Sequence, residues 1–405
     1  MNRETIEKLQ SQRLEKILQY VYEKNQLYRE KFKLIGIKPT DIKSVEDLSK
    51  LFFTTKKELR DAYPLGFLCI PKEKIVRIQM SGGTTGSPVI IPYSKEDIEQ
   101  WREMMARDFK IAGVTQKDVV QITPAFGLWN GGFGFHFGAE AIGCFIIPMG
   151  PGNTRNQLRF MKDFDTTVLC STASYPLRLA EVASEIGFNL KQLKLKKMIL
   201  GAEFWSEAMR KKIEDTFNVK TFDIPGLTEM GGVGTTGIEC PFHKGIHIWE
   251  DQYIVEVINP ETGEVLEEGK EGELVYTTLT RCATPLIRYR SGEISSILSK
   301  EKCKCGLSFM RINRIKGRAD DMIIYRGVKF YPSEIEEILA KHDISQYQLI
   351  VSAERIKILI ESGDNNIPKI NKDIKEFIGF MPQIEVLPPR TLKRYDGKTP
   401  RIIRK

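Results

Sequence analysis

The chain has 405 residues, of which 41% are hydrophobic and 28% charged, and its formal net charge is +8. This length exceeds what one core usually fills, and the ordinary composition excludes a fibrous or largely disordered protein. Because 53 acidic residues are interleaved with the basic ones, the charge predicts attraction for small anions such as nucleotides rather than a nucleic-acid surface. The sequence has no apolar run of about 18 residues and no signal-like start, so we expect a cytoplasmic protein that does not span a membrane.

Hydrophobic periodicity predicts the first elements in chain order. Residues 6–21 carry apolar side chains at helical spacing between charges, which indicates an amphipathic helix. Between residues 75 and 312, β-rich runs such as VVQITP and TTVLCS alternate with helical segments such as SKEDIEQWREMMARDF, which favours parallel sheets with crossover helices. From about residue 250, YIVEVINPETGEVLEEGKEGELVYTTL predicts two antiparallel strands, so the sheets should be mixed.

The last part of the chain has a different pattern. After GRADDMIIYRGVKF come a helix, PSEIEEILAKH, two strands, YQLIVSA and IKILIES, a second helix, KINKDIKEFI, and a basic tail. We therefore predict an α/β fold with a large domain at residues 1–318 and a small α+β domain at residues 319–405.

A glycine- and threonine-rich loop follows a strand-like segment in IQMSGGTTGSP, residues 78–88. Glycines let backbone N–H groups approach phosphate oxygens, and hydroxyls supply further donors. The loop is not a Walker motif, because no Gly-Lys-Ser/Thr follows at the required spacing, and alone it could be an ordinary turn. The candidate phosphate-binding residues are Ser81, Gly82, Gly83, Thr84, Thr85 and Gly86.

A second motif, DIPGLTEMGG, lies about 140 residues further along the chain. It places Asp223 after a strand and Thr228 and Glu229 beyond it, and these oxygen ligands could bind the metal ion that accompanies ATP. The two motifs together, in this order, predict a nucleotide site.

Six motifs along the chain resemble one enzyme family. SGGTTGSP, LGAEFW, DIPGLTE, TPLIRYRSGE, GRADDMIIYRGVKFYPSEIEE and RYDGK are similar to the ordered signature motifs of the phenylacetate–coenzyme A ligases, which are adenylate-forming enzymes. The resemblance runs from the first helix to the last residues. It implies that ATP and Mg²⁺ activate an aryl or arylacetic acid as an acyl-adenylate, and that the acyl group then passes to the thiol of coenzyme A.

The resemblance also implies roles for single residues. Residues 81–86 would hold the ATP phosphates, Thr228 and Glu229 would bind phosphate and Mg²⁺, and Lys398 would reach into the site during adenylation. Asp320 would be the hinge on which a mobile C-terminal domain rotates between the two half-reactions. The residues around the nucleoside would be Gly201, Ala202, Glu203, Asp223 and Glu293.

Three positions depart from the family pattern. Glu293 stands where an aspartate usually binds the ribose, Ser87 replaces a frequent lysine, and Pro225 replaces the aromatic residue that stacks on adenine. These departures keep a nucleotide-binding homologue without ligase activity as an alternative. A carrier-protein phosphopantetheine remains an alternative acceptor, a homodimer is possible because relatives often dimerise, and a nucleic-acid-binding protein is supported only by the charge.

An aromatic and glycine-rich segment, PAFGLWNGGFGFHFGAE, is the candidate acyl pocket. Its aromatic side chains could form a flat apolar slot for an aryl acid, or they could be core residues on a glycine-rich helix. The candidate pocket residues are Phe126, Trp129, Phe133, Phe135 and His136, the last of which could also be structural.

Cysteine and histidine residues form two closely spaced pairs in ECPFHKGIH and KCKCG. Cys240, His247, Cys303 and Cys305 supply the three thiolates and one imidazole of a closed, structural zinc site, with His243 as an alternative ligand. The alternative is that these residues are unrelated.

Overall fold

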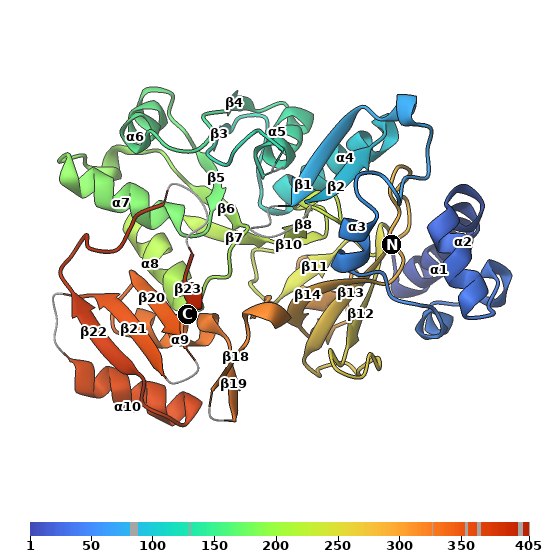
Figure 1. Cartoon of the computed structure of the whole chain (residues 1–405). Helices are drawn as coiled ribbons and strands as arrows, with labels where there is room; N and C mark the ends of the chain where they lie inside the picture. The colour runs from blue at the N-terminus through green and yellow to red at the C-terminus, as the bar shows by residue number, and fades with distance from the viewer. Residues whose placement is uncertain are drawn as a thin grey trace. The chain divides into compact units, whose positions relative to one another are not determined.

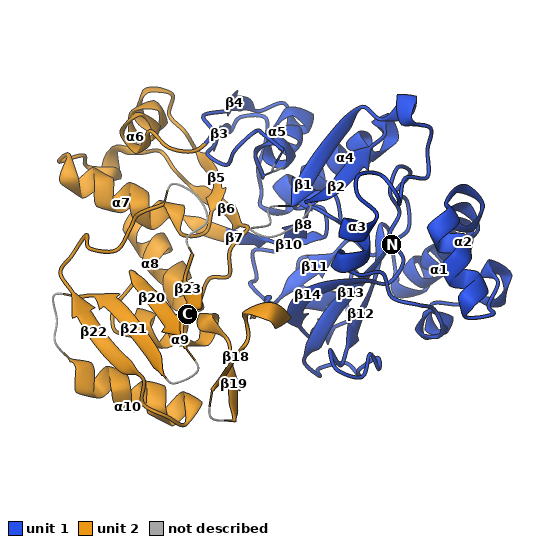
Figure 2. Cartoon of the chain, in the orientation of Figure 1, with its two compact units in different colours: residues 1–150, 222–315 blue, residues 151–221, 316–405 orange. Residues whose placement is uncertain are grey.

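The structure is a computed structural model, and it consists of two compact units (Figures 1 and 2). Each unit combines two separate segments of the chain: residues 1–150 with 222–315 form unit 1, and residues 151–221 with 316–405 form unit 2. These units are groups of residues that pack closely together, and they do not test where one domain ends and the next begins. The domain boundary expected at residue 318 therefore stays a prediction. The described residues are 1–81, 88–128, 131–325, 327–352, 355–362, 366–395 and 400–404.

The amphipathic helix expected at the start of unit 1 is confirmed. Helix α1 (Arg3–Lys24) buries Ile6 and Leu14, and the Asn2 side chain caps it by accepting the Thr5 N–H (2.9 Å). The other helices of this unit are α2 (Gln26–Leu34), α3 (Lys56–Asp61), α4 (Lys95–Ile111) and α5 (Gly131–Ile142).

The strands of unit 1 pair both ways, as the mixed pattern predicts. β3 (Val119–Ile122) and β4 (Phe145–Ile147) are parallel, whereas β12 (Tyr253–Ile258), β13 (Gly272–Thr278) and β14 (Tyr289–Ser295) are antiparallel. The described residues of this unit form three further antiparallel sheets, which are the β1–β2 pair (Arg77–Ser81, Val89–Tyr93), the β8–β9 pair (Gly226–Leu227, Gly232–Val233), and β10–β11–β16–β15 (Gly237–Glu239, Ile246–Ile248, Arg311–Ile312, Ile297–Ser299).

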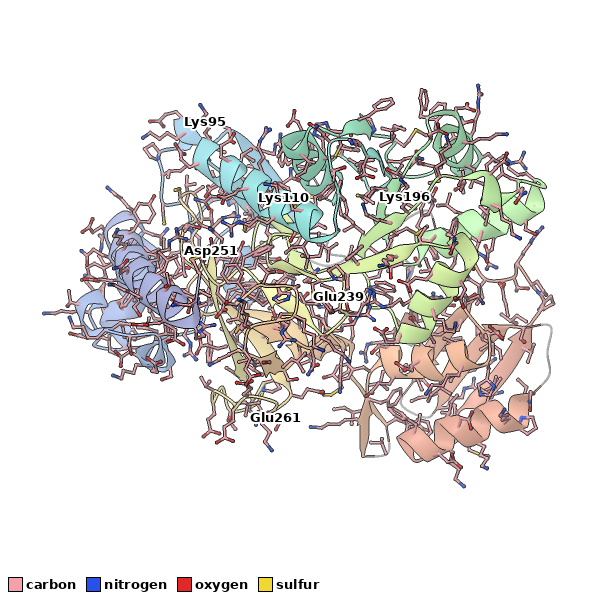
Figure 3. All side chains as sticks on the ribbon, turned by 180° about the vertical axis from the view of Figure 1, so that it is seen from behind. Lys95, Lys110, Lys196, Glu239, Asp251 and Glu261 are labelled. Carbon is pink, nitrogen blue, oxygen red and sulfur yellow. The ribbon has the colours of Figure 1, made fainter. Side chains whose placement is uncertain are left out.

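Helix α4 begins at a capping box, in which Ser94 and Asp97 bond each other's backbone N–H, and Figure 3 labels Lys95 and Lys110 near its two ends. Its Asp108 is fully buried, and neither carboxylate oxygen accepts a hydrogen bond from the described residues. Burial raises the pKa of Asp108 well above 3.8, although Trp249 and Arg107 act in the opposite direction. At pH values between the unfolded and the folded pKa, Asp108 is therefore protonated in the folded protein and ionised in the unfolded chain.

Replacing Asp108 with asparagine is expected to stabilise the protein at neutral and basic pH. Because the pKa of Asp108 is higher in the folded protein than in the unfolded chain, the free energy of unfolding falls as pH rises from the unfolded pKa to the folded pKa. Asparagine does not titrate, so the variant lacks this loss of stability. We expect a gain of about 1–3 kcal/mol at pH 8 and a smaller gain at pH 5.5, measured by urea unfolding at both pH values.

Asp97 supplies the matched control for this measurement, because it is equally buried on the same helix. Its carboxylate accepts backbone N–H groups of Ser94, Cys282 and Ala283 at 2.8–3.0 Å, so Asp97→Asn should destabilise. Equal gains from Asp108→Asn at the two pH values would contradict this account of Asp108.

Unit 2 contains two separate hydrophobic cores, one in each of its segments. Leu158, Leu179 and Ile213 belong to the core of residues 158–219, whereas Ile338, Ile358 and Ile374 belong to that of residues 323–378. The first segment contains α6 (Thr154–Asp163), β5 (Val168–Thr172), α7 (Tyr175–Glu185), β6 (Lys197–Gly201) and α8 (Glu207–Phe217), with β5 and β6 parallel. Strand β7 (Lys220–Ile224) crosses from unit 2 into unit 1.

The second segment of unit 2 confirms the predicted order of helices and strands. Its four-stranded sheet has the order β22–β21–β20–β23, with β20 and β21 antiparallel. The elements are β17 (Gly317–Arg318), β18 (Ile323–Tyr325), β19 (Val328–Phe330), α9 (Pro332–Lys341), β20 (Tyr347–Val351), β21 (Ile356–Glu361), α10 (Ile367–Ile378), β22 (Gln383–Leu387) and β23 (Ile402–Arg404).

Polar side chains join the two segments of unit 2. The contacts are Arg394–Glu181 (3.1 Å), Arg390–Glu185 (3.3 Å), the Ser206 N–H to Glu336 (3.3 Å) and the Lys212 ammonium to the Asp343 carbonyl (3.2 Å).

Among the described residues, no helix is both long and apolar enough to cross a bilayer.

Candidate active site

The Thr228–Glu229 pair lies on a tight turn between β8 and β9 of unit 1. A side chain at Gly226 would place its Cβ only 2.2 Å from the Gly232 carbonyl oxygen, so the close approach of the strands requires glycine. The hydroxyls of two buried tyrosines hold the turn: Tyr93 donates to the Gly231 carbonyl (3.0 Å) and Tyr253 to the Met230 carbonyl (2.7 Å).

Glu229 presents an unused acceptor. It is buried, and its Oε1 accepts no hydrogen bond from the described residues. The Lys56 ammonium from α3 lies 3.7 Å from this oxygen, which is an ion-pair distance rather than a good hydrogen bond. A buried carboxylate oxygen with free lone pairs, one residue after the Thr228 hydroxyl in the sequence, fits the oxygen ligands that Mg²⁺ prefers.

Asp223 and Glu293 occupy different strands of unit 1. Asp223 is the second-last residue of β7. The Nε of Arg314 donates to its carboxylate at 2.7 Å, and its own N–H donates to Glu239 (3.3 Å). Glu293 is buried on β14, with its N–H bonded to the Ser291 hydroxyl (3.0 Å). The nucleotide-binding roles of both carboxylates stay predictions.

Ser81 is buried at the end of β1, where the candidate phosphate loop begins. The rest of that loop, Gly82, Gly83, Thr84, Thr85 and Gly86, lies outside the described residues, as do Ser87, Trp129 and Lys398.

The Gly201–Ala202–Glu203 turn follows β6 in unit 2. Ala202 has φ of +66°, a left-handed conformation that is uncommon for a residue with a side chain and that often marks functional sites. The Glu203 carboxylate accepts the Ser174 backbone N–H (2.8 Å), which ties this turn to the segment before α7.

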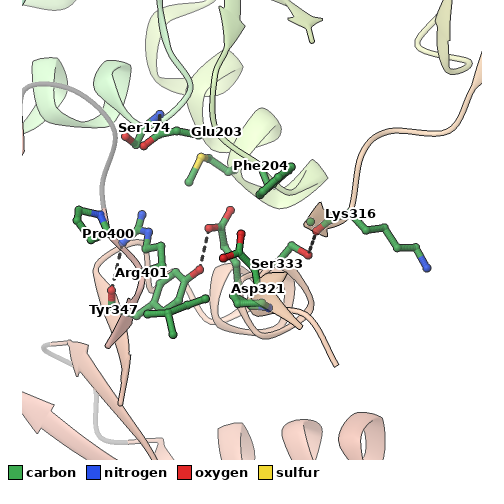
Figure 4. Close-up of a pocket in the computed structure, with 14 residues that line it drawn as sticks. Ser174, Glu203, Phe204, Lys316, Asp321, Ser333, Tyr347, Pro400 and Arg401 are labelled. Carbon is green, nitrogen blue, oxygen red and sulfur yellow. Dashed lines mark hydrogen bonds between the residues drawn. The ribbon is translucent and has the colours of Figure 1, made fainter. Parts of the chain in front are cut away.

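Glu203 also lines a pocket of unit 2 (Figure 4), whose empty volume is about 860 Å³ with its open mouth included. Phe204 and Met209 add apolar wall from the first segment, and Tyr347 and Arg401 add polar wall from the second. The pocket therefore places both segments of unit 2 beside the candidate adenine-binding turn.

Glu336, at the same pocket, is a buried carboxyl group that links the two segments. It accepts the Tyr347 hydroxyl (2.9 Å) and the Ser206 N–H (3.3 Å). Burial raises the pKa of Glu336, and the charge of Arg401 opposes this rise.

Asp320, the predicted hinge, lies in a short 3-10 turn (Ala319–Asp321) between β17 and β18. Its side chain is 70% exposed and pairs with Arg318 (2.8 Å), and its carbonyl accepts from Arg404 (3.0 Å). An exposed turn between short strands can absorb a change of backbone angles, as a hinge requires, but the hinge role stays a prediction.

The aromatic residues predicted for the acyl pocket are partly brought together. Phe126 meets Phe133 edge to face (ring centroids 5.5 Å apart) and lies 6.3 Å from the His136 ring. Arg77 lies over Phe133 at 4.3 Å. Phe135 is only 1% exposed and packs in the core of α5, so its side chain contributes to the fold.

Cys240, His247, Cys303 and Cys305 converge in unit 1, with their four ligand atoms all within 4.8 Å of one another. The sulfurs of Cys240 and Cys303 are 3.8 Å apart, which matches the edge of about 3.8 Å expected for tetrahedral zinc with Zn–S bonds of about 2.3 Å. Nε2 of His247 lies 3.3 Å from the Cys305 sulfur. The cluster thus fits a closed zinc site.

Local structure prepares these ligands for a metal ion. His247 Nδ1 lies 3.3 Å from the Phe309 carbonyl, which favours a proton on Nδ1 and leaves Nε2 free to bind metal. Burial lowers the pKa of His247 to about 4, so the imidazole is neutral at physiological pH. Gly237 lets β10 approach β11, because a Cβ there would lie 1.7 Å from the His247 carbonyl oxygen. His243, the alternative ligand, instead pairs with Glu239 (3.2 Å).

Several residues near these sites have no role predicted from the sequence. Tyr93 and Tyr253 position the Thr228–Glu229 turn, Lys56 faces Glu229, and Glu336 joins the segments of unit 2. Two of them had a nearby sequence signal: Glu336 lies in the motif of residues 317–337, and Thr55 and Glu58 form a capping box that fixes the start of α3 beside Lys56.

Comparison with known proteins gives a consistent result. A family model described as AMP-binding enzyme matches residues 15–279, and one described as AMP-binding enzyme C-terminal domain matches residues 327–405. The phenylacetate-coenzyme A ligase of Aromatoleum evansii is 38% identical over 98% of this chain and 93% of its own length, and that of Thermus thermophilus is 36% identical over 98% and 95%.

A solved structure shares the fold. The crystal structure of a 2-hydroxyisobutyryl-CoA ligase in the postadenylation state, in complex with 2-HIB-AMP, has a TM-score of 0.92 at 24% identity, covering 100% of this chain and 90% of that one. The two family models and the identity to the curated ligases show that the chain belongs to the phenylacetate–coenzyme A ligase family of AMP-binding enzymes.

Proposed function

We propose that this protein activates an aryl or arylacetic acid with ATP, forming an acyl-adenylate and pyrophosphate, and then transfers the acyl group to coenzyme A. The main support is the identity of 38% to a phenylacetate-coenzyme A ligase along nearly the whole chain. In this reaction the substrate carboxylate is the nucleophile, so the enzyme has to bind, orient and neutralise charge rather than supply a general base.

The described residues suit this task. Glu229 and Thr228 would hold Mg²⁺ at the phosphates, and the bound ion would supply charge neutralisation there. The Gly201–Glu203 turn would hold the adenine, Asp223 and Glu293 the nucleoside, and Phe126 with Phe133 the aryl group. Lys398 would stabilise the α-phosphate during adenylation, and Asp320 would be the hinge of a mobile C-terminal domain. We propose a cytoplasmic location and a structural zinc ion on the cysteine and histidine cluster.

The first test is acid-dependent ATP–pyrophosphate exchange over a panel of phenylacetate, benzoate, hydroxybenzoates, anthranilate and short fatty acids. We expect exchange with at least one aryl acid and a rate at least ten-fold lower for Lys398→Ala. Exchange by no acid, with folded protein that binds ATP, would favour the nucleotide-binding homologue. Adding coenzyme A or a carrier protein to the enzyme, ATP and an acid that supports exchange then identifies the thiol that accepts the acyl group.

A further inference from the structure

The Lys56 side chain reaches the candidate magnesium site from a distant part of the chain. Helix α3 begins with Lys56 and packs against β2 and β14, and the Lys56 ammonium is 3.7 Å from Oε1 of Glu229. The Lys56 side chain is 26% exposed and that of Glu229 is 5% exposed, so the pair lies where protein meets solvent.

The backbone that carries Lys56 is firmly held. The Thr54 N–H donates to the carbonyl of Arg288, the residue before β14 (3.0 Å), and the Thr54 carbonyl accepts the Arg290 N–H of β14 (2.9 Å). Glu58 then accepts the Thr55 N–H (2.7 Å) in the capping box of α3. The backbone at the start of α3 is therefore held by one sheet and a helix cap, as expected for a segment that presents a group to a ligand.

The contact with Glu229 leaves the Lys56 ammonium without a hydrogen bond. At 3.7 Å the pair is outside good hydrogen-bond range, so only charge attraction joins the two groups. The described residues accept no hydrogen bond from the ammonium, so all three of its N–H donors remain for another anion.

The sequence supplies the reason for a cation here. The candidate phosphate loop itself carries no cation, because residues 78–88 read IQMSGGTTGSP, without lysine or arginine. ATP and pyrophosphate carry several negative charges, and a point charge such as an ammonium group suits them.

We infer that Lys56 binds the β- and γ-phosphates of Mg·ATP, and the pyrophosphate released from it, beside the metal ion held by Glu229. Before the nucleotide arrives, Lys56 balances the Glu229 carboxylate. This inference rests on the proposed function, because that function is what places phosphates at Glu229.

The test compares Lys56→Met with Lys57→Met. Methionine keeps the apolar stem of lysine without its charge. Lys57 is the next residue, is 83% exposed and pairs with Asp61, so it serves as the matched control. Calorimetry with Mg·ATP, Mg·pyrophosphate and AMP measures binding, and a thermal melt of each variant measures folding.

We expect Lys56→Met to weaken binding of Mg·ATP and Mg·pyrophosphate by about 10- to 100-fold. AMP lacks the outer phosphates, so its affinity should stay within about two-fold, a pattern that a merely structural lysine would not produce. Lys56→Arg keeps the charge and should recover most of the loss. If Lys56→Met melts early, Lys56→Gln takes its place.

Equal affinities for Lys56→Met and Lys57→Met would overturn the inference, and so would an equal loss of AMP binding. The proposed function fails in a different way: wild-type protein would bind Mg·ATP but exchange pyrophosphate with no acid. In that case the affinities of the Lys56 and Lys57 variants for Mg·ATP still test the role of Lys56. Wild-type protein that binds no Mg·ATP would overturn both.

Discussion

Glu229→Gln is expected to lower acid-dependent ATP–pyrophosphate exchange by about 100-fold, equivalent to about 3 kcal/mol of transition-state stabilisation. Glutamine keeps the shape of the buried side chain, so the turn pinned by Tyr93 and Tyr253 should persist. What is lost is the negative charge that would hold Mg²⁺. The magnesium concentration needed for half-maximal rate should therefore rise.

The control for this prediction is Glu268→Gln, which removes an exposed carboxylate from the same unit and should leave exchange unchanged. Exchange and thermal melting are measured for both variants over a range of magnesium concentrations. A Glu229→Gln enzyme with unchanged rate and unchanged magnesium dependence would show that this carboxylate does not hold the metal.

Cys303→Ser is expected to remove bound zinc and to lower the melting temperature by about 10 °C. Metal binding to a closed site contributes directly to folding free energy, and loss of about 3–4 kcal/mol shifts the melting temperature of a large domain by this amount. The effect should extend beyond the cluster, because Cys240 follows Glu239, labelled in Figure 3, which accepts the Asp223 N–H.

Cys144→Ser is the matched control, since Cys144 is a partly exposed thiol outside the cluster. Zinc content is measured by elemental analysis of protein purified without a metal-binding tag, alongside the melting curve. Wild-type protein with far less than one zinc ion per chain, or equal melting of the two variants, would remove the case for a structural zinc ion.

Local patterns explain why much of the fold could be predicted. Helix α1, the parallel β5 and β6, and the antiparallel β12 and β13 follow from hydrophobic period and strand composition, which act over short stretches of chain. The pairing of residues 151–221 with 316–405 could not be predicted, because it depends on contacts between segments far apart in sequence.

The candidate site could also be predicted only in part. The spacing of Cys240, His247, Cys303 and Cys305 predicted ligands that do converge. Lys56 belongs to none of the six motifs, and Glu336 lies in one of them without a predicted role, because each acts on a partner that only the folded chain brings near. Phe135 is 1% exposed and its role in the acyl pocket stays a prediction, because periodicity alone does not distinguish an aromatic core residue from the wall of a pocket.

The polar contacts between the two segments of unit 2 have a consequence for turnover. If the proposed mobile domain, residues 319–405, rotates between half-reactions, Glu181, Glu185 and Lys212 would each lose a charged or carbonyl partner, and water could hydrate these groups. Each segment would keep its own hydrophobic core, because no single core is shared between them. These contacts could then be broken and remade in every catalytic cycle without unfolding either segment.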